Sequence, residues 1–121
     1  MIVKYLGRAT ENNSVPFSVS ESTLTVGNEY SNVKLDLEAL QQDSSIDVPI
    51  LEDYMGNLKV NEGNATAMIV KIPPSKYTFV ETGEVNDKGE KVVSKKKIPV
   101  DVENVELIVW KLLYALKNKE D

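Results

Sequence analysis

The residues of this sequence with the most capacity for chemistry are its carboxylates, because the chain contains no histidine and no cysteine. Histidine is the commonest general acid or base near neutral pH, and with cysteine it supplies most zinc and iron–sulfur ligands. Catalytic triads built on Ser-His or Cys-His are therefore excluded, and so are disulfides. The chemistry left to the chain depends on carboxylates, lysines, hydroxyls and backbone groups.

Two groups of carboxylates have spacings that a site could use. Asp36 and Glu38 would share one face of a strand, and a carboxylate pair is the minimum for glycoside hydrolysis, but a solvated charged face explains them better. Residues 43–47 (Asp-Ser-Ser-Ile-Asp) resemble the start of a calcium loop. Val48 and Tyr54, however, stand where that loop needs glycine and glutamate. We therefore predict no catalytic residue, no metal site, no cofactor and no enzymatic activity.

Size and charge restrict the class of protein further. The 121 residues fit one domain spanning 1–121, and the net charge of −5 disfavours nucleic acid or an anionic membrane as partner. Glycine-rich phosphate loops are absent. The one basic run, Lys95-Lys96-Lys97, is typical of an edge strand protected against aggregation, with contact to phosphate or an acidic partner as the alternative.

No targeting segment is evident. Apolar stretches such as Leu107–Trp110 are far shorter than the roughly 20 residues needed to span a bilayer, and residues 1–7 lack the pattern of a secretory signal. We expect a protein that is cytoplasmic or assembled into a particle.

Negative charge is concentrated in the middle of the chain. Between Glu29 and Glu62 there are eight acidic residues against two lysines. This predicts an acidic patch that a basic surface on a partner could attract. The residues assigned to it are Asp43, Asp47, Glu52 and Asp53.

Short antiparallel strands are expected over most of the chain, up to about Pro99. Apolar/polar alternation or β-rich composition marks residues 2–6, 22–26, 33–37, 46–51, 57–60 and 67–72. The third of these could instead continue as a helix through residues 38–42, which are good helix formers. Residues 77–82 and 91–95 flank Asn86-Asp87-Lys88-Gly89, which predicts a hairpin with an exposed turn.

A single helix, at about residues 102–118, is predicted to end the chain. Asp101 would cap it, with Glu103 and Glu106 near its positive end rather than in a cation site. Apolar residues repeat every three or four positions, at Val105, Ile108, Val109, Leu112 and Leu116. The β-branched residues within 105–112 leave a strand as the alternative. The predicted fold class is α+β: antiparallel strands and hairpins followed by one C-terminal helix.

A second apolar stripe on this helix, Leu107, Trp110 and Tyr114, predicts a protein interface, with burial in the chain's own core as the alternative. The leading functional hypothesis is a non-enzymatic structural or assembly protein that acts through protein contacts. It would be a homo-oligomer or a subunit of a larger, phage-like particle. The second hypothesis is an acidic inhibitor that occupies a basic groove on an enzyme.

Overall fold

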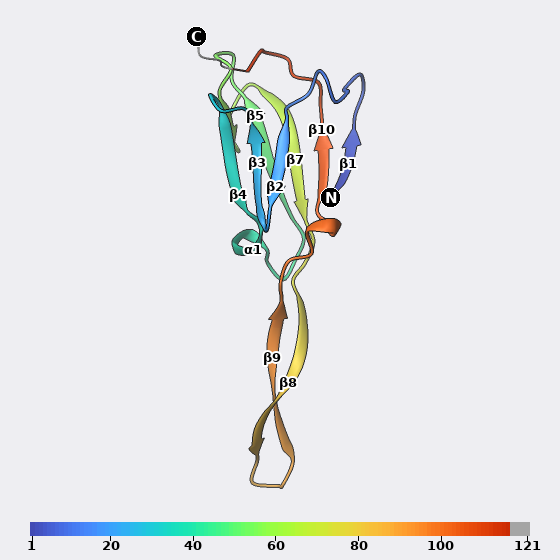
Figure 1. Ribbon diagram of the computed structural model, residues 1–121, viewed down its shortest axis with the longest axis vertical. Coiled ribbons are helices and arrows are strands. Elements are labelled where there is room, and N and C mark those ends of the chain that lie inside the picture. The colour runs from blue at the N-terminus through green and yellow to red at the C-terminus, as the bar shows by residue number, and fades with distance from the viewer. Residues whose placement is uncertain (117–121) are drawn as a thin grey trace.

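Strands form a two-layer body from which a two-stranded arm extends, as the computed structural model of residues 1–116 shows (Figure 1). The larger sheet has the order β1 (Ile2–Tyr5), β10 (Glu106–Val109), β7 (Ala65–Ile72), β5 (Ile46–Glu52) and β6 (Leu58–Val60). The smaller sheet consists of β2 (Phe17–Ser20), β3 (Thr23–Gly27) and β4 (Asn32–Asp36). The arm is β8 (Lys76–Val85) paired with β9 (Lys91–Ile98).

The core lies between the two sheets of the body. Alternate residues of the central strands point inward, as the buried Met68 and Val70 of β7 and the buried Leu24 and Val26 of β3 illustrate. Burying such side chains contributes about 25 cal/mol for each Å² of apolar surface removed from water. The body, meaning residues 1–75 and 99–116, therefore has the apolar core that stabilises the fold.

The first and last strands close one side of the larger sheet. β1 runs parallel to β10, with Val3 paired with Leu107, whereas the other strand pairs of this sheet are antiparallel. The amide of Ile2 donates to the carbonyl of Val105, so the pairing begins at the N-terminus. Two segments a hundred residues apart thus become neighbours, and local sequence patterns cannot report such a contact.

The α+β prediction was wrong, because the predicted C-terminal helix is absent from its described part, 102–116. Residues 106–109 form β10, and the fold is mainly β. Leu107 and Val109 are buried and alternate with partly exposed neighbours, which is the two-residue period of a strand. Hydrogen bonding to β1 on one side and β7 on the other outweighs the local helical spacing. Residues 117 and 118 of the predicted helix lie outside the described residues.

The capping role predicted for Asp101 is nevertheless found on a smaller scale, and Asp36 provides a second cap that was not predicted. Asp101 accepts a hydrogen bond from the Glu103 amide at 3.1 Å, but it caps only the 3₁₀ turn η1 (Val102–Asn104). Asp36 likewise caps the four-residue helix α1 (Leu37–Leu40), which follows β4 directly. For residues 33–42 we had predicted either a strand or a helix. The structure has both, because the strand β4 is followed directly by the short helix α1.

Candidate functional site

The arm, residues 76–98, is the part of the structure that differs most from the body. Antiparallel pairing sets Tyr77 opposite Lys97 and Phe79 opposite Lys95. Every residue of β8 is exposed, and most of β9 is exposed as well. The ribbon projects away from both sheets (Figure 1), so no third strand or helix of the body covers either of its faces. Because an isolated two-stranded hairpin is marginally stable in water, this is an unusual arrangement.

The tip of the arm confirms the predicted hairpin. The Asn86 side-chain oxygen accepts hydrogen bonds from the amides of Lys88 and Glu90, at 2.9 and 3.0 Å. Gly89 has φ of +78°, the left-handed conformation that favours glycine, and its amide donates to the Asn86 carbonyl. A side-chain bond to a backbone two residues on is the mechanism by which asparagine starts a turn.

At the base of the arm, polar contacts connect β9 to α1. The Lys97 ammonium donates to Glu38 Oε1 at 2.8 Å and to Gln41 Oε1 at 2.6 Å. The second oxygen of Glu38 accepts from the Val100 amide at 2.6 Å, just beyond β9. The Lys97 bond, followed by the Val100 bond, lowers the pKa of Glu38 below its usual value. Glu38 therefore acts as a charged connection between the arm and the body.

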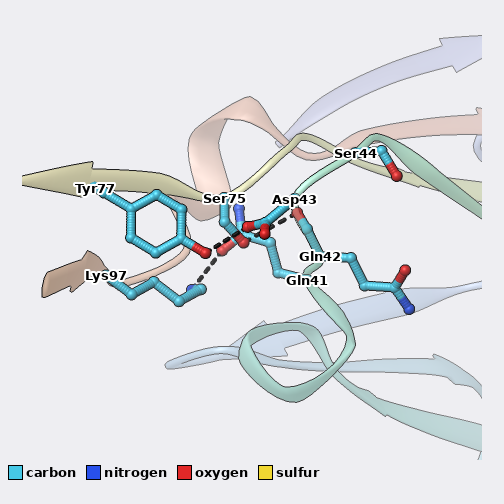
Figure 2. A pocket seen from close by; sticks show the side chains of 7 residues that line it. All are labelled: Gln41, Gln42, Asp43, Ser44, Ser75, Tyr77 and Lys97. Carbon is cyan, nitrogen blue, oxygen red and sulfur yellow. Dashed lines mark hydrogen bonds between the residues drawn. The ribbon is translucent and has the colours of Figure 1, made fainter. Parts of the chain in front are cut away.

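The other strand is held by the residues that follow α1 (Figure 2). The Tyr77 hydroxyl donates to the Asp43 carboxylate, and this bond raises the pKa of the tyrosine. The amide and hydroxyl of Ser75 both donate to the Gln42 carbonyl, at 2.7 and 3.0 Å. The Lys95 ammonium lies 3.9 Å from the centre of the Tyr77 ring, a cation–π contact within the arm.

Residues that make these contacts line an open polar hollow at the base of the arm (Figure 2). Its lining residues are Gln41, Gln42, Asp43, Ser44, Ser75, Tyr77 and Lys97. The Tyr77 phenol donates to the Asp43 carboxylate, and the Lys97 ammonium donates to Gln41 and Glu38. The raised pKa of Tyr77 opposes its use as a base near neutral pH. The arrangement fixes the direction in which the arm leaves the body.

Large apolar side chains are exposed along the arm. Phe79 is 70% exposed, Val85 62% and Val93 53%, and Val80 and Ile98 are also exposed. An aromatic ring so accessible on an element that contributes nothing to the apolar core is a candidate for contact with another protein.

The three predicted interface residues do not share one surface. Leu107 is fully buried in the body's core on β10. Trp110 and Tyr114 follow β10 and are partly exposed, and the Trp110 amide donates to the Ala67 carbonyl. In an extended chain, residues three apart point to opposite faces, so the stripe that a helix would have made is divided.

The predicted acidic residues are likewise separated. Asp43 lies at the base of the arm, whereas Asp47 pairs with Lys71 at 3.2 Å near the start of β5. Asp53 lies just beyond the other end of β5, about 20 Å away at the rise of a strand. It accepts 2.9 Å bonds from the amides of Asn57 and Met55, which lower its pKa.

Glu52 has a role that the sequence-based interpretation missed. Its side chain is fully buried, and Oε1 accepts from the amides of Leu113 and Tyr114, the latter at 2.9 Å. Oε2 is buried with no hydrogen-bond partner among the described residues. Val48, Ile50 and Glu52 alternate inward, so the two-residue period was the available signal. The carboxylate connects the end of β5 to the C-terminal segment.

No protein-family model, curated protein or solved structure matches the chain. Within residues 1–116, no helix is long and apolar enough to cross a bilayer, and no group of three or more acidic side chains is placed to hold a metal ion.

Proposed function

We propose that this protein is a non-enzymatic structural or assembly component that contacts other protein subunits through its arm. The observation that carries the proposal is a ribbon exposed on both faces, held in a fixed direction by the contacts of Lys97 and Tyr77 at its base. Membership of an oligomer or of a larger, phage-like particle would give the ribbon the covering that the body does not provide.

Two features support contact as the purpose of the arm. Its residues are absent from the apolar core, so the body does not require the ribbon for its own packing. The exposed Phe79, Val85 and Val93 leave apolar surface in water, which costs free energy unless a partner covers it. Trp110, partly exposed on the body, is a second candidate contact.

The acidic-inhibitor hypothesis has less support. Of its four carboxylates, Glu52 is buried, Asp47 is paired with Lys71, and Asp43 and Asp53 accept hydrogen bonds from their own chain. Carboxylates that are buried, paired or separated in this way attract a basic groove more weakly than one continuous acidic patch would.

Shortening the arm tests the proposal. Replacing residues 79–95 by Asn-Gly joins Thr78 to Lys96, which face each other in the ribbon. The variant keeps the hydrogen bonds of Tyr77 and Lys97 at the base and removes the contact of Lys95 with the Tyr77 ring. We expect the body to retain its circular dichroism and melting temperature while the protein loses self-association or its co-purifying partner.

A matched control removes exposed apolar side chains from the body instead. Tyr54 and Met55 are 69% and 66% exposed in the turn between β5 and β6. Tyr54→Ser with Met55→Ser is expected to leave association intact. An arm-shortened protein that keeps every association of the wild type would refute the assembly role.

A further inference from the structure

The arm has two unpaired strand edges, and they differ in chemistry. Each strand of a two-stranded ribbon bonds its partner on one side only, which leaves the other side open to a further strand. β9 carries the run Lys95–Lys97, and lysines on an edge discourage pairing. β8 presents Tyr77-Thr78-Phe79-Val80, four residues of high β propensity that are all exposed. The edge of β8 is the better site for an added strand, and its most regular part precedes the register shift between Glu81 and Val85.

Charge is divided along the length of the arm. The half nearest the body, residues 76–80 and 94–98, carries four lysines and no acidic residue: Lys76, Lys95, Lys96 and Lys97. The outer half, residues 81–93, carries four acidic residues against two lysines: Glu81, Glu84, Asp87 and Glu90 against Lys88 and Lys91. The basic half thus has a formal charge of +4, in which Lys97 is already paired with Glu38 of the body, and the acidic half a formal charge of −2.

The body is a poor surface for the acidic half of another copy's arm. Residues 1–75 and 99–116 contain thirteen acidic residues and six basic ones, a formal charge of −7. Like charges brought together disfavour that contact. The basic half of a second arm is the complementary surface, and two arms satisfy this complementarity at both ends only when they lie antiparallel.

We propose that two copies of this chain join their arms side by side and antiparallel, through the edges of β8, in a twofold-symmetric dimer. The four strands then have the order β9-β8-β8-β9. Each basic half lies beside the partner's acidic half, and the exposed Phe79 and Val80 come to the centre. Such an interface is self-complementary, as twofold symmetry requires. The inference rests on the proposed role of the arm in contact and identifies the partner as a second copy.

Reversing charge in one half at a time tests this geometry. The first variant combines Lys76→Glu, Lys95→Glu and Lys96→Glu, which changes the basic half from +4 to −2 and leaves the Lys97 contacts in place. The second combines Glu84→Lys and Glu90→Lys, which changes the acidic half from −2 to +2. Either variant alone places like charges beside each other in the antiparallel pair.

We expect the wild type to sediment as a dimer at low salt and each variant to dissociate at least tenfold more readily. An equimolar mixture of the two variants should restore a dimer containing one chain of each, because both contacts are again between opposite charges. Higher salt should weaken the wild-type dimer. Circular dichroism of each variant checks that the body remains folded.

Wild-type protein that is monomeric at high concentration, or variants that fail to combine when mixed, would overturn the inference. If the arm-shortened protein nevertheless loses a different partner, the assembly role stands and only the identity of the partner is wrong. If the shortened protein keeps all of its associations, both proposals fail together.

Discussion

The body and the arm obtain their order from different interactions. Apolar side chains packed between two sheets hold the body, where Leu24, Met68 and Leu107 are completely buried. The arm has one backbone ladder and a set of polar contacts at its base, with β8 exposed throughout. A change of one side chain should therefore have global consequences in the body and local ones in the arm.

Replacing a glycine of the body and a glycine of the arm with valine is the test with the largest expected effect on stability. A Cβ at Gly27 (φ +116°) would lie 2.1 Å from the Ser31 carbonyl oxygen and 2.8 Å from Leu58 Cδ1. Gly27→Val should cost more than about 3 kcal/mol, because both backbone strain and a core clash oppose it. At Gly89 (φ +78°) nothing lies within 4 Å, so Gly89→Val meets strain alone, of about 1–3 kcal/mol.

Thermal unfolding and amide exchange distinguish the two outcomes. Gly27→Val should lower the melting temperature of the whole protein. Gly89→Val should leave it nearly unchanged while amides of residues 84–91 exchange faster. Equal loss of global stability in both variants would mean that the arm and body unfold as one unit.

The same contrast explains how much of the structure could be predicted from sequence. The arm depends on local rules, and the turn chemistry of Asn86 and Gly89 was enough to find it. Residues 102–116 depend on neighbours distant in sequence: β1 pairs with β10 across the chain's length. Helical spacing was therefore misleading for these residues. The surface expected from Leu107, Trp110 and Tyr114 depended on the same spacing, and the three residues do not share one surface.

The contacts at the base of the arm were beyond prediction for a related reason. Lys97 belonged to a run interpreted as edge protection, and Glu38 to a carboxylate pair on a solvated face. Their 2.8 Å ion pair joins residues 59 positions apart. Only the fold brings α1 to the base of the hairpin, so no spacing rule could have linked them.

The buried carboxylate of Glu52 gives the next largest expected effect. Replacing it with leucine leaves the amides of Leu113 and Tyr114 without their acceptor and should cost about 2–3 kcal/mol. Glu52→Gln is the matched control, because its amide oxygen can still accept both bonds. Urea unfolding measures the difference. Equal stability of the leucine and glutamine variants would show that the two bonds contribute nothing to the fold.

The smallest expected effect concerns the pH dependence of the contacts at the base of the arm. Because the folded-state pKa of Glu38 lies below its usual 4.5, the carboxylate stabilises these contacts fully above about pH 4.5. That stabilisation is lost as the pH falls through the lower folded-state value, when protonation weakens the bonds to Lys97 and Val100. The Val100 amide resonance should report this loss directly, since its proton is bonded to the titrating group.

Two variants separate this connection from acid effects on the body. Glu38→Gln should abolish the shift of the Val100 resonance on acidification. Asp53→Asn removes another carboxylate of lowered pKa, in the turn after β5, and should leave the shift intact. A Val100 resonance at the same position in the wild type and in Glu38→Gln at pH 6 would show that Glu38 does not hold the base of the arm. The direction of the arm would then depend on the contacts of Tyr77 and Ser75 and on the bond from Lys97 to Gln41.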